Sequence, residues 1–400
     1  FLKPEGEKDP EAIVEAIEKN KITTMHFVPS MLNIFLEYID GKVDAERLKS
    51  LKQVFASGEA LGANQVRRFN RLLNESNGTK LHNLYGPTEA TIDVSYFGCS
   101  TGEDFDVIPI GKPIDNIKLY IVDKSNNLQP IGVPGELMIS GDGLARGYLN
   151  RPELTEEKFI SNPFNSSEVS DTNYKRMYKT GDLAKWMNDG NIEYLGRLDH
   201  QVKVRGFRIE TGEIEACLLE HIKIKDVVVL AKEDKEANKY LCAYLVADGE
   251  ITVSEIREHL SHKLPDYMIP SHFVSLDKMP LTSNGKVDRK GLPEPDGSLD
   301  TGVEYIAPRD EVEEKLAKIW QEVLEISKVS IHDNFFNLGG HSLKATVVVS
   351  NINREFDVDI EITELFQKQT IADVADLIKA KQEEVDLIQD LLNEVKGLDM

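Results

Sequence analysis

Apolar residues recur with two different spacings along the first hundred residues of the chain. In PEAIVEAIEKN, Ile13, Val14 and Ile17 fall on one helical face, and the segment ITTMHFV that follows has the pattern of a strand. The segments LKQVFASG and TKLHNLYG repeat a strand followed by glycine, with the helical pattern NQVRRFNRLL between them. This alternation of strands and helices predicts an α/β domain.

The pattern changes twice further along the chain. From about Asp106 to Gly196, short apolar runs such as KLYIVD, GELMIS and NIEYLG are separated by Gly, Pro and Asn turns, which predicts short strands. From 200 to 293, the alternating segment QVKVRG precedes the helical pattern GEIEACLLEHI. We expect a second, smaller α+β unit there.

The last hundred residues predict a helical bundle. Pro, Gly and Asp dominate the stretch around 294–304, which is typical of a linker. After it, EVEEKLAKIWQEVL, HSLKATVVVSNINREF and ADVADLIKAK each place apolar residues on one helical face. We therefore expect a four-helix bundle over 305–381, followed at 382–400 by an acidic amphipathic tail or linker.

Length, charge and cysteine content narrow the class of protein. A chain of 400 residues predicts two or three domains, and its net charge of −22 argues against nucleic acid or an anionic membrane as a partner. No apolar run approaches the roughly 18 residues of a membrane span. The three cysteines are scattered, which fits a cytoplasmic protein. The chain opens at Phe1 without a signal peptide, and we expect it to be a segment of a longer protein.

Six short motifs in one order indicate the chemistry. They are NLYGPTEAT, GELMISGDGLARGYL, YKTGDL, GRLDHQVKVRGFRIETGEIE, LPDYMIP and PLTSNGKVDR. In the first, Gly86 and Pro87 predict a turn that places donors near an anion, and Glu89 is a suitable hard ligand for magnesium. Any one motif could be an ordinary surface turn, but six in this order are not expected by chance.

The motifs resemble those of amino-acid adenylation domains of nonribosomal peptide synthetases. The resemblance implies that 1–199 is the later part of the large lobe and 200–293 the small mobile lobe. It implies binding of ATP by Asn83, Tyr85, Gly86, Thr88, Asp182 and Arg197, with Glu89 on magnesium. It also implies that the small lobe turns about Asp199 between two half-reactions, with Lys286 as the catalytic lysine of adenylation.

The same resemblance identifies an amino-acid pocket. Its residues present here are His26, Phe55, Ser57, Leu84, Ile92 and Asp93. The set is similar to that of serine-activating domains. Because His26, Ser57 and Asp93 would leave polar groups unpaired against an apolar side chain, they favour a substrate hydroxyl. The alternative is a merely small pocket that favours alanine or glycine.

A separate motif, DNFFNLGGHSL, resembles the attachment site of peptidyl carrier domains. Two glycines allow a tight turn, so that Ser342 is expected at a helix N-terminus, where backbone N–H groups favour an incoming phosphate. The resemblance implies a covalent phosphopantetheine on Ser342, added by a phosphopantetheinyl transferase. It also implies neighbouring condensation or termination domains as partners.

The expected activity is therefore ATP-dependent activation of an amino acid, L-serine, and its transfer to the carrier thiol. The alternatives are an acyl- or aryl-CoA ligase of the same superfamily and a scaffold piece whose adenylation part is not catalytic. The family's Gly/Ser/Thr-rich phosphate loop would lie upstream of Asn83, and the 400 residues contain no such stretch. We therefore expect the enzyme to be incomplete in this chain.

Overall fold

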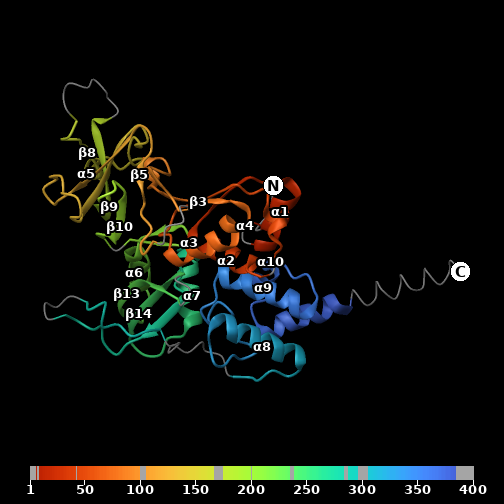
Figure 1. Ribbon diagram of the computed structural model, residues 1–400. Helices are drawn as coiled ribbons and strands as arrows, with labels where there is room; N and C mark the ends of the chain where they lie inside the picture. The colour runs from red at the N-terminus through yellow and green to blue at the C-terminus, as the bar shows by residue number, and fades with distance from the viewer. Residues whose placement is uncertain are drawn as a thin grey trace. The chain divides into compact units, whose positions relative to one another are not determined.

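The computed structural model describes residues 9–41, 43–99, 105–165, 174–199, 201–234, 238–282, 287–295 and 305–383, together with Gly6. For Ser342 and Leu343 it describes the backbone alone. The chain forms two compact units (Figure 1). Unit 1 comprises Phe1–Glu210 and Lys235–Lys239, and unit 2 comprises Thr211–Asp234 and Tyr240–Met400.

Unit 1 contains a five-stranded mixed sheet in the order β1-β2-β3-β4-β5. The first three strands are parallel, and the last two are antiparallel to their neighbours. The strands are β1 (Thr24–Phe27), β2 (Gln53–Ala56), β3 (Lys80–Tyr85), β4 (Ser95–Gly98) and β5 (Lys112–Pro113). Because parallel strands end at one edge, the segments that follow β1, β2 and β3 are brought together there.

Helices pack on this sheet through the residues whose spacing predicted them. Ile13, Val14 and Ile17 of the first helix are buried with Val54 of β2 in one apolar core. The Asp9 carboxylate accepts hydrogen bonds from two backbone N–H groups at the start of that helix. The helical elements are α1 (Pro10–Asn20), α2 (Pro29–Ile39), η2 (Ala45–Leu48), α3 (Ala63–Phe69), the π-helical η3 (Asn70–Asn74), α4 (Glu75–Asn77) and η4 (Thr88–Ala90).

A second sheet of unit 1 has the order β10-β9-β7-β6, with β8 paired to β9. Its strands are β6 (Ile117–Val122), β7 (Gly135–Gly141), β8 (Phe159–Ser161), β9 (Arg176–Trp186) and β10 (Ile192–Arg197), and helix α5 (Pro152–Lys158) precedes β8. The antiparallel hairpin of β11 (Val202–Val204) and β12 (Phe207–Ile209) also belongs to this unit. Unit 1 therefore extends past 199, the boundary expected from the motifs.

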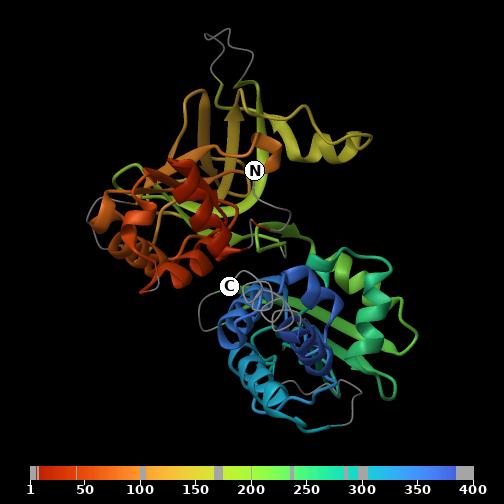
Figure 2. The same cartoon turned by 90° about the vertical axis from the view of Figure 1, so that its right-hand side faces the viewer.

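Unit 2 begins with a three-stranded sheet in the order β13-β14-β15 and continues into helices. The first part contains α6 (Thr211–Leu219), β13 (Ile224–Glu233), β14 (Lys239–Ala247), α7 (Val253–Ser261), η6 (Asp266–Met268) and β15 (His272–Ser275). The second contains α8 (Glu311–Leu324), α9 (Ser342–Phe356), α10 (Ile362–Gln367) and the helical segment 371–383. These helices, cyan to blue in Figure 2, enclose an apolar core around Trp320 and Phe335. The predicted fold class, α/β followed by a helical bundle, is confirmed.

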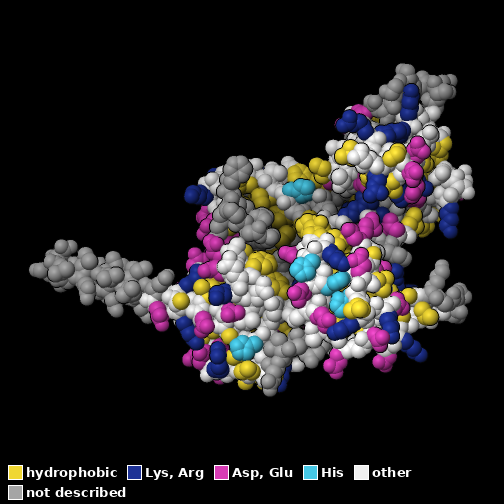
Figure 3. Space-filling view, turned by 180° about the vertical axis from the view of Figure 1, so that it is seen from behind, with side chains coloured by type: hydrophobic (Ala, Val, Ile, Leu, Met, Phe, Trp, Pro, Cys, Tyr) yellow, Lys and Arg dark blue, Asp and Glu magenta, His cyan; other side chains and the backbone are white. Residues whose placement is uncertain are grey.

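The surface and the helices agree with two simple expectations from composition. On the face shown in Figure 3, acidic and basic side chains are interspersed, as is usual for a solvated surface. Within the described ranges, no helix is both long and apolar enough to cross a membrane.

Candidate active site

The NLYGPTEAT motif leaves the end of β3 and folds back on itself. At Gly86, an added Cβ atom would lie 2.2 Å from the Ile92 carbonyl oxygen, so any side chain there would collide with backbone. Thr91 and Ile92 have positive φ angles of 59° and 73°, which are uncommon for non-glycine residues and worst for β-branched ones. Such strained backbone is often found at functional sites. The turn holds Tyr85, Glu89 and the predicted pocket residues close together.

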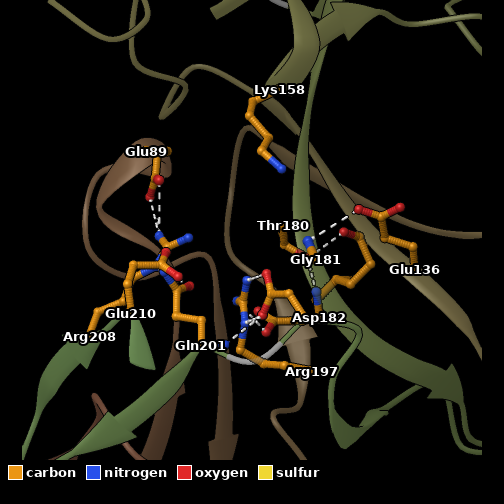
Figure 4. Close-up of polar contacts among 12 residues, drawn as sticks. Glu89, Glu136, Lys158, Thr180, Gly181, Asp182, Arg197, Gln201, Arg208 and Glu210 are labelled. Atoms are coloured by element: carbon orange, nitrogen blue, oxygen red, sulfur yellow. Dashed lines mark hydrogen bonds and ion pairs between the residues drawn. The ribbon is translucent and has the colours of Figure 1, made fainter. Parts of the chain in front are cut away.

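A buried charge cluster lies beside this turn (Figure 4). Asp182 of β9 is 3% exposed, and its carboxylate accepts hydrogen bonds from the Tyr85 hydroxyl and, at 2.8 Å, from Arg197 Nη1. Arg197 also donates two hydrogen bonds of 2.6 Å to the two oxygens of Asp199. At Gly181, a Cβ atom would lie 2.8 Å from Arg197 Nη2, so the glycine makes room for the guanidinium. Three predicted nucleotide-binding residues and the predicted hinge residue therefore meet.

Burial controls the protonation of this cluster. Burial raises the pKa of Asp182 above its usual value, although the positive charge of Arg197 opposes the shift. Burial also raises the pKa of the Tyr85 hydroxyl, and the neighbouring Asp182 charge adds to the effect. Because Arg197 carries a fixed positive charge between two carboxyl groups, the cluster can present carboxylate acceptors in a partly dehydrated site.

The predicted magnesium ligand Glu89 is engaged by protein groups. Arg208 Nη1 lies 2.9 and 2.8 Å from its two carboxylate oxygens, and the Tyr148 hydroxyl donates to Oε1 at 2.7 Å (Figure 4). Burial alone would raise the pKa of Glu89, but the hydrogen bond from Tyr148 and the charge of Arg208 outweigh it and lower the pKa. Glu89 is therefore an anionic carboxylate.

Arg208 reaches Glu89 because the β11–β12 hairpin is docked on the rest of unit 1. The Gly206 amide donates to Glu59 Oε1 at 3.2 Å, and a Cβ atom on Gly206 would lie 2.6 Å from Val28 Cγ1. Lys203 Nζ lies 5.6 Å from the centre of the Tyr85 ring, within the range of a cation–π contact. The tip and both strands of the hairpin thus contact this part of unit 1.

The predicted amino-acid pocket residues come from the ends of the parallel strands and the β3 turn. His26 Nε2 and Ser57 Oγ are 2.8 Å apart, and the Phe55 ring stacks on His82 with centroids separated by 5.1 Å. Within the described part of the chain, buried Asp93 Oδ1 has no hydrogen-bond partner. Burial raises the pKa of Asp93, and the nearby charge of His26 opposes this shift.

The other predicted residues have more ordinary surroundings. The buried Asn83 side chain donates to the Pro109 carbonyl at 2.8 Å, and Leu84 is half-buried on β3. Thr88 is exposed at the start of η4, and Ile92 is 68% exposed. Lys286 lies outside the described residues.

The carrier motif forms a tight turn that leads into α9. The Gly340 amide donates to the Phe335 carbonyl at 3.0 Å, and Gly339 has a φ of 93°. Helix α9 begins at Ser342, as expected, and the cap residue is His341, whose Nδ1 accepts from the Lys344 amide at 3.3 Å.

Several residues of these sites have no counterpart among the predicted ones. Sequence reasoning missed Tyr148, Arg208, Lys203 and His82, which are common residue types inside ordinary strand or turn patterns. The only available signal was position, since Tyr148 lies in GELMISGDGLARGYL, and Lys203 and Arg208 lie in the motif that follows β10.

Comparison with known proteins connects the two sites. Residues 1–149 match the AMP-binding enzyme family, 213–286 match the AMP-binding enzyme C-terminal domain, and 314–378 match the phosphopantetheine attachment site. The chain is 51% identical over 378 residues to a mycosubtilin synthase of Bacillus subtilis. It is 49% identical over 380 residues to tyrocidine synthase 3 of Brevibacillus parabrevis. The chain belongs to the nonribosomal peptide synthetase family.

These matches cover most of the chain but little of the relatives. They span 94% of the chain and 14% of the mycosubtilin synthase, and 95% of the chain and 6% of tyrocidine synthase 3. The fold is also similar to the structure of holo-PA1221, described as a synthetase protein with adenylation and carrier domains. The TM-score is 0.74 at 24% identity, covering 93% of this chain and 60% of that one.

The family assignment confirms the predicted adenylate-forming ligase and its cofactors. Adenylate-forming domains use ATP and magnesium, and the attachment-site match indicates a covalent phosphopantetheine. Proteins commonly bind magnesium through one or two carboxylates together with substrate phosphates and water. Across the described residues, no group of three or more His, Cys, Asp or Glu side chains could hold a metal.

Proposed function

We propose that this synthetase segment activates L-serine with ATP and loads it onto a phosphopantetheine carried by Ser342. In the first step, an amino-acid carboxylate oxygen attacks the α-phosphorus of ATP and pyrophosphate leaves. In the second, the pantetheine thiol attacks the acyl carbon, its proton is lost, and AMP leaves. The observation that supports this best is the joining of Asp182, Arg197 and Tyr85 in one site of unit 1.

The proposed roles follow from the chemistry of each group. The Asp182 carboxylate is suited to accept hydrogen bonds from the ribose hydroxyls, with Arg197 holding it in place. Glu89 is the proposed protein ligand of magnesium, which would neutralise charge on the phosphates. Lys286 is proposed to stabilise the charge that develops on the phosphates during adenylation. Asn83, Gly86 and Thr88 are proposed to line the nucleotide site.

The case for serine rests on the polar groups of the pocket. His26 and Ser57 form one hydrogen-bonded pair, and Asp93 Oδ1 is buried without a partner among the described residues. An unpaired buried acceptor costs about 1–3 kcal/mol, which a substrate hydroxyl or ammonium group can recover. The partly buried ring of Phe55 and the neighbouring Leu84 and Ile92 would limit the size of the side chain accepted.

The remaining proposals concern organisation and partners. We propose a large-lobe portion at 1–199, a small lobe at 200–293 with its hinge at Asp199, a linker at 294–304, a carrier domain at 305–381 and a tail at 382–400. The partners are a phosphopantetheinyl transferase and neighbouring condensation or termination domains. The three cysteines are free and buried, which supports a cytoplasmic location.

Amino-acid-dependent exchange of pyrophosphate into ATP, measured with the intact protein that contains this chain, tests the proposal. The panel comprises L-serine, L-threonine, L-alanine, glycine, a fatty acid and an aryl acid. We expect L-serine to give the highest rate. A higher rate with alanine or glycine would contradict the serine assignment, and a higher rate with the fatty or aryl acid would contradict amino-acid activation.

Two serine variants sharpen the test. Ser57→Ala is expected to lower the serine-to-alanine ratio by about 10-fold, the effect of losing one well-placed hydrogen bond of ~1.4 kcal/mol. Ser76→Ala is the matched control, since Ser76 Oγ donates to the Leu72 carbonyl at 2.6 Å on an exposed helical segment. An unchanged ratio in Ser57→Ala would remove Ser57 from the pocket.

A further inference from the structure

The Glu89–Arg208 pair places two different demands on one carboxylate. Arg208 Nη1 is within 2.9 Å of both Glu89 oxygens, and the Tyr148 hydroxyl takes a further position on Oε1. The carboxyl group is largely buried, with a side-chain exposure of 11%. It therefore has little room for an additional ligand while Arg208 remains in place.

A metal ion and the guanidinium cannot share this position. Magnesium binds carboxylate oxygens at about 2.0–2.1 Å in near-octahedral geometry and keeps water or phosphate on its other sides. A guanidinium that contacts both oxygens of Glu89 would stand in that shell, and two positive charges that close repel one another strongly at low dielectric.

Displacement of Arg208 would also disturb the hairpin that carries it. Arg208 Nε donates to the Gln201 side chain, which in turn donates to Glu210, so the arginine is part of a local network around β11 and β12. The hairpin's other contacts to unit 1 are the weak 3.2 Å hydrogen bond from Gly206 to Glu59, packing on Val28 and the contact of Lys203 with Tyr85.

We propose that Arg208 competes with magnesium for Glu89, so that the β11–β12 hairpin docks as seen here only when the metal is not on this carboxylate. The inference rests on the proposed function, because it takes Glu89 as the magnesium ligand. Two ligands that exclude each other must weaken each other reciprocally. Arg208 is thus a positioning residue that separates a metal-loaded state for adenylation from a state with the hairpin docked.

Binding of Mn²⁺ tests the competition without a turnover assay. The intact protein is titrated with Mn²⁺ in the presence of saturating α,β-methylene-ATP, and free Mn²⁺ is measured by electron paramagnetic resonance. Arg208→Gln is expected to lower the Kd for Mn²⁺ by about 5-fold or more, the lower end of typical coupling between sites. Arg208→Lys, which keeps the charge, is expected to fall between the parent and Arg208→Gln.

Two further variants distinguish the competition from the metal assignment. Glu89→Gln is expected to raise the Kd for Mn²⁺, whereas Arg71→Gln, which breaks a 2.8 Å ion pair with Asp40 elsewhere in unit 1, is expected to leave it unchanged. A raised Kd in Glu89→Gln together with an unchanged Kd in Arg208→Gln would overturn the competition and leave the metal assignment standing. An unchanged Kd in Glu89→Gln would overturn both.

Hydrogen exchange gives a second readout on the parent protein. If docking and metal binding exclude each other, Mn²⁺ with the nucleotide analogue should accelerate exchange of the amides at 202–209. In Arg208→Gln these amides should exchange faster even without metal. Slower exchange at 202–209 on addition of Mn²⁺ would overturn the proposal.

Discussion

Replacing Gly340 by alanine is expected to destabilise the helical bundle that carries Ser342. The added Cβ atom would lie 2.4 Å from two ring carbons of Phe335 and 2.5 Å from its backbone oxygen. Phe335 is fully buried and packs edge-on against Trp320, with ring centroids 5.1 Å apart. Since the backbone oxygen is crowded as well, turning the ring cannot relieve the overlap.

The magnitude follows from the cost of overpacking. Extra atoms in a well-packed core cost typically about 1–3 kcal/mol, and we expect the upper end here. For a domain of 60–100 residues, 1 kcal/mol corresponds to roughly 4–8 °C, so the unfolding midpoint of the bundle should fall by about 12–24 °C.

Tryptophan fluorescence can follow this unit alone. The chain has two tryptophans, and in a Trp186→Phe background the remaining Trp320 reports the bundle core. Gly212→Ala is the control, because no heavy atom lies within 4 Å of the Cβ position there and alanine favours helix α6. A Gly340→Ala midpoint equal to that of the parent would show that the predicted overlap does not exist.

Three further outcomes are expected. Lys286→Ala should lower pyrophosphate exchange by about 100-fold or more, through lost charge stabilisation, while transfer of preformed aminoacyl-adenylate to the carrier stays near the parent rate; near-normal exchange would exclude the assigned role. Ser342→Ala should abolish the single phosphopantetheine mass added from CoA by a phosphopantetheinyl transferase, and modification that survives would move the site elsewhere. Burial, with the charges of Lys344 and Arg257, lowers the pKa of His272 to about 4, so its contribution to stability is present above about pH 6.5 and is lost as the pH falls toward 4. His272→Gln should flatten this part of the urea-unfolding profile, and an unchanged profile would show that His272 does not cause it.

The fold was predictable wherever apolar spacing is strong. The helix over Pro10–Asn20 and the strands before Ser57 and Gly86 lie where the sequence places them, because the residues that define the periodicity are the buried ones. The helical pattern GEIEACLLEHI instead ends at Leu219, and His221 lies beyond the helix. Helix ends depend on local caps and packing that periodicity does not reveal.

The placement of the β11–β12 hairpin could not be predicted in this way. The alternating segment around Lys203 is compatible with a strand of either unit, and a basic strand most simply predicts a solvated face. What decides is the pairing of Arg208 with Glu89, 119 residues earlier, and the contact of Lys203 with Tyr85. Such long-range pairs are invisible to local patterns, which is why the motifs indicated Asp182, Arg197 and Glu89 but not the arginine that binds Glu89.

Mass spectrometry of the carrier peptide tests the central claim most directly. The intact protein is first converted with CoA and a phosphopantetheinyl transferase, and is then incubated with ATP, magnesium and an equimolar mixture of L-serine, L-alanine, L-threonine and glycine. The peptide that contains Ser342 should then carry phosphopantetheine with one seryl group. A peptide that carries phosphopantetheine alone, or mainly one of the other three amino acids, would contradict the account.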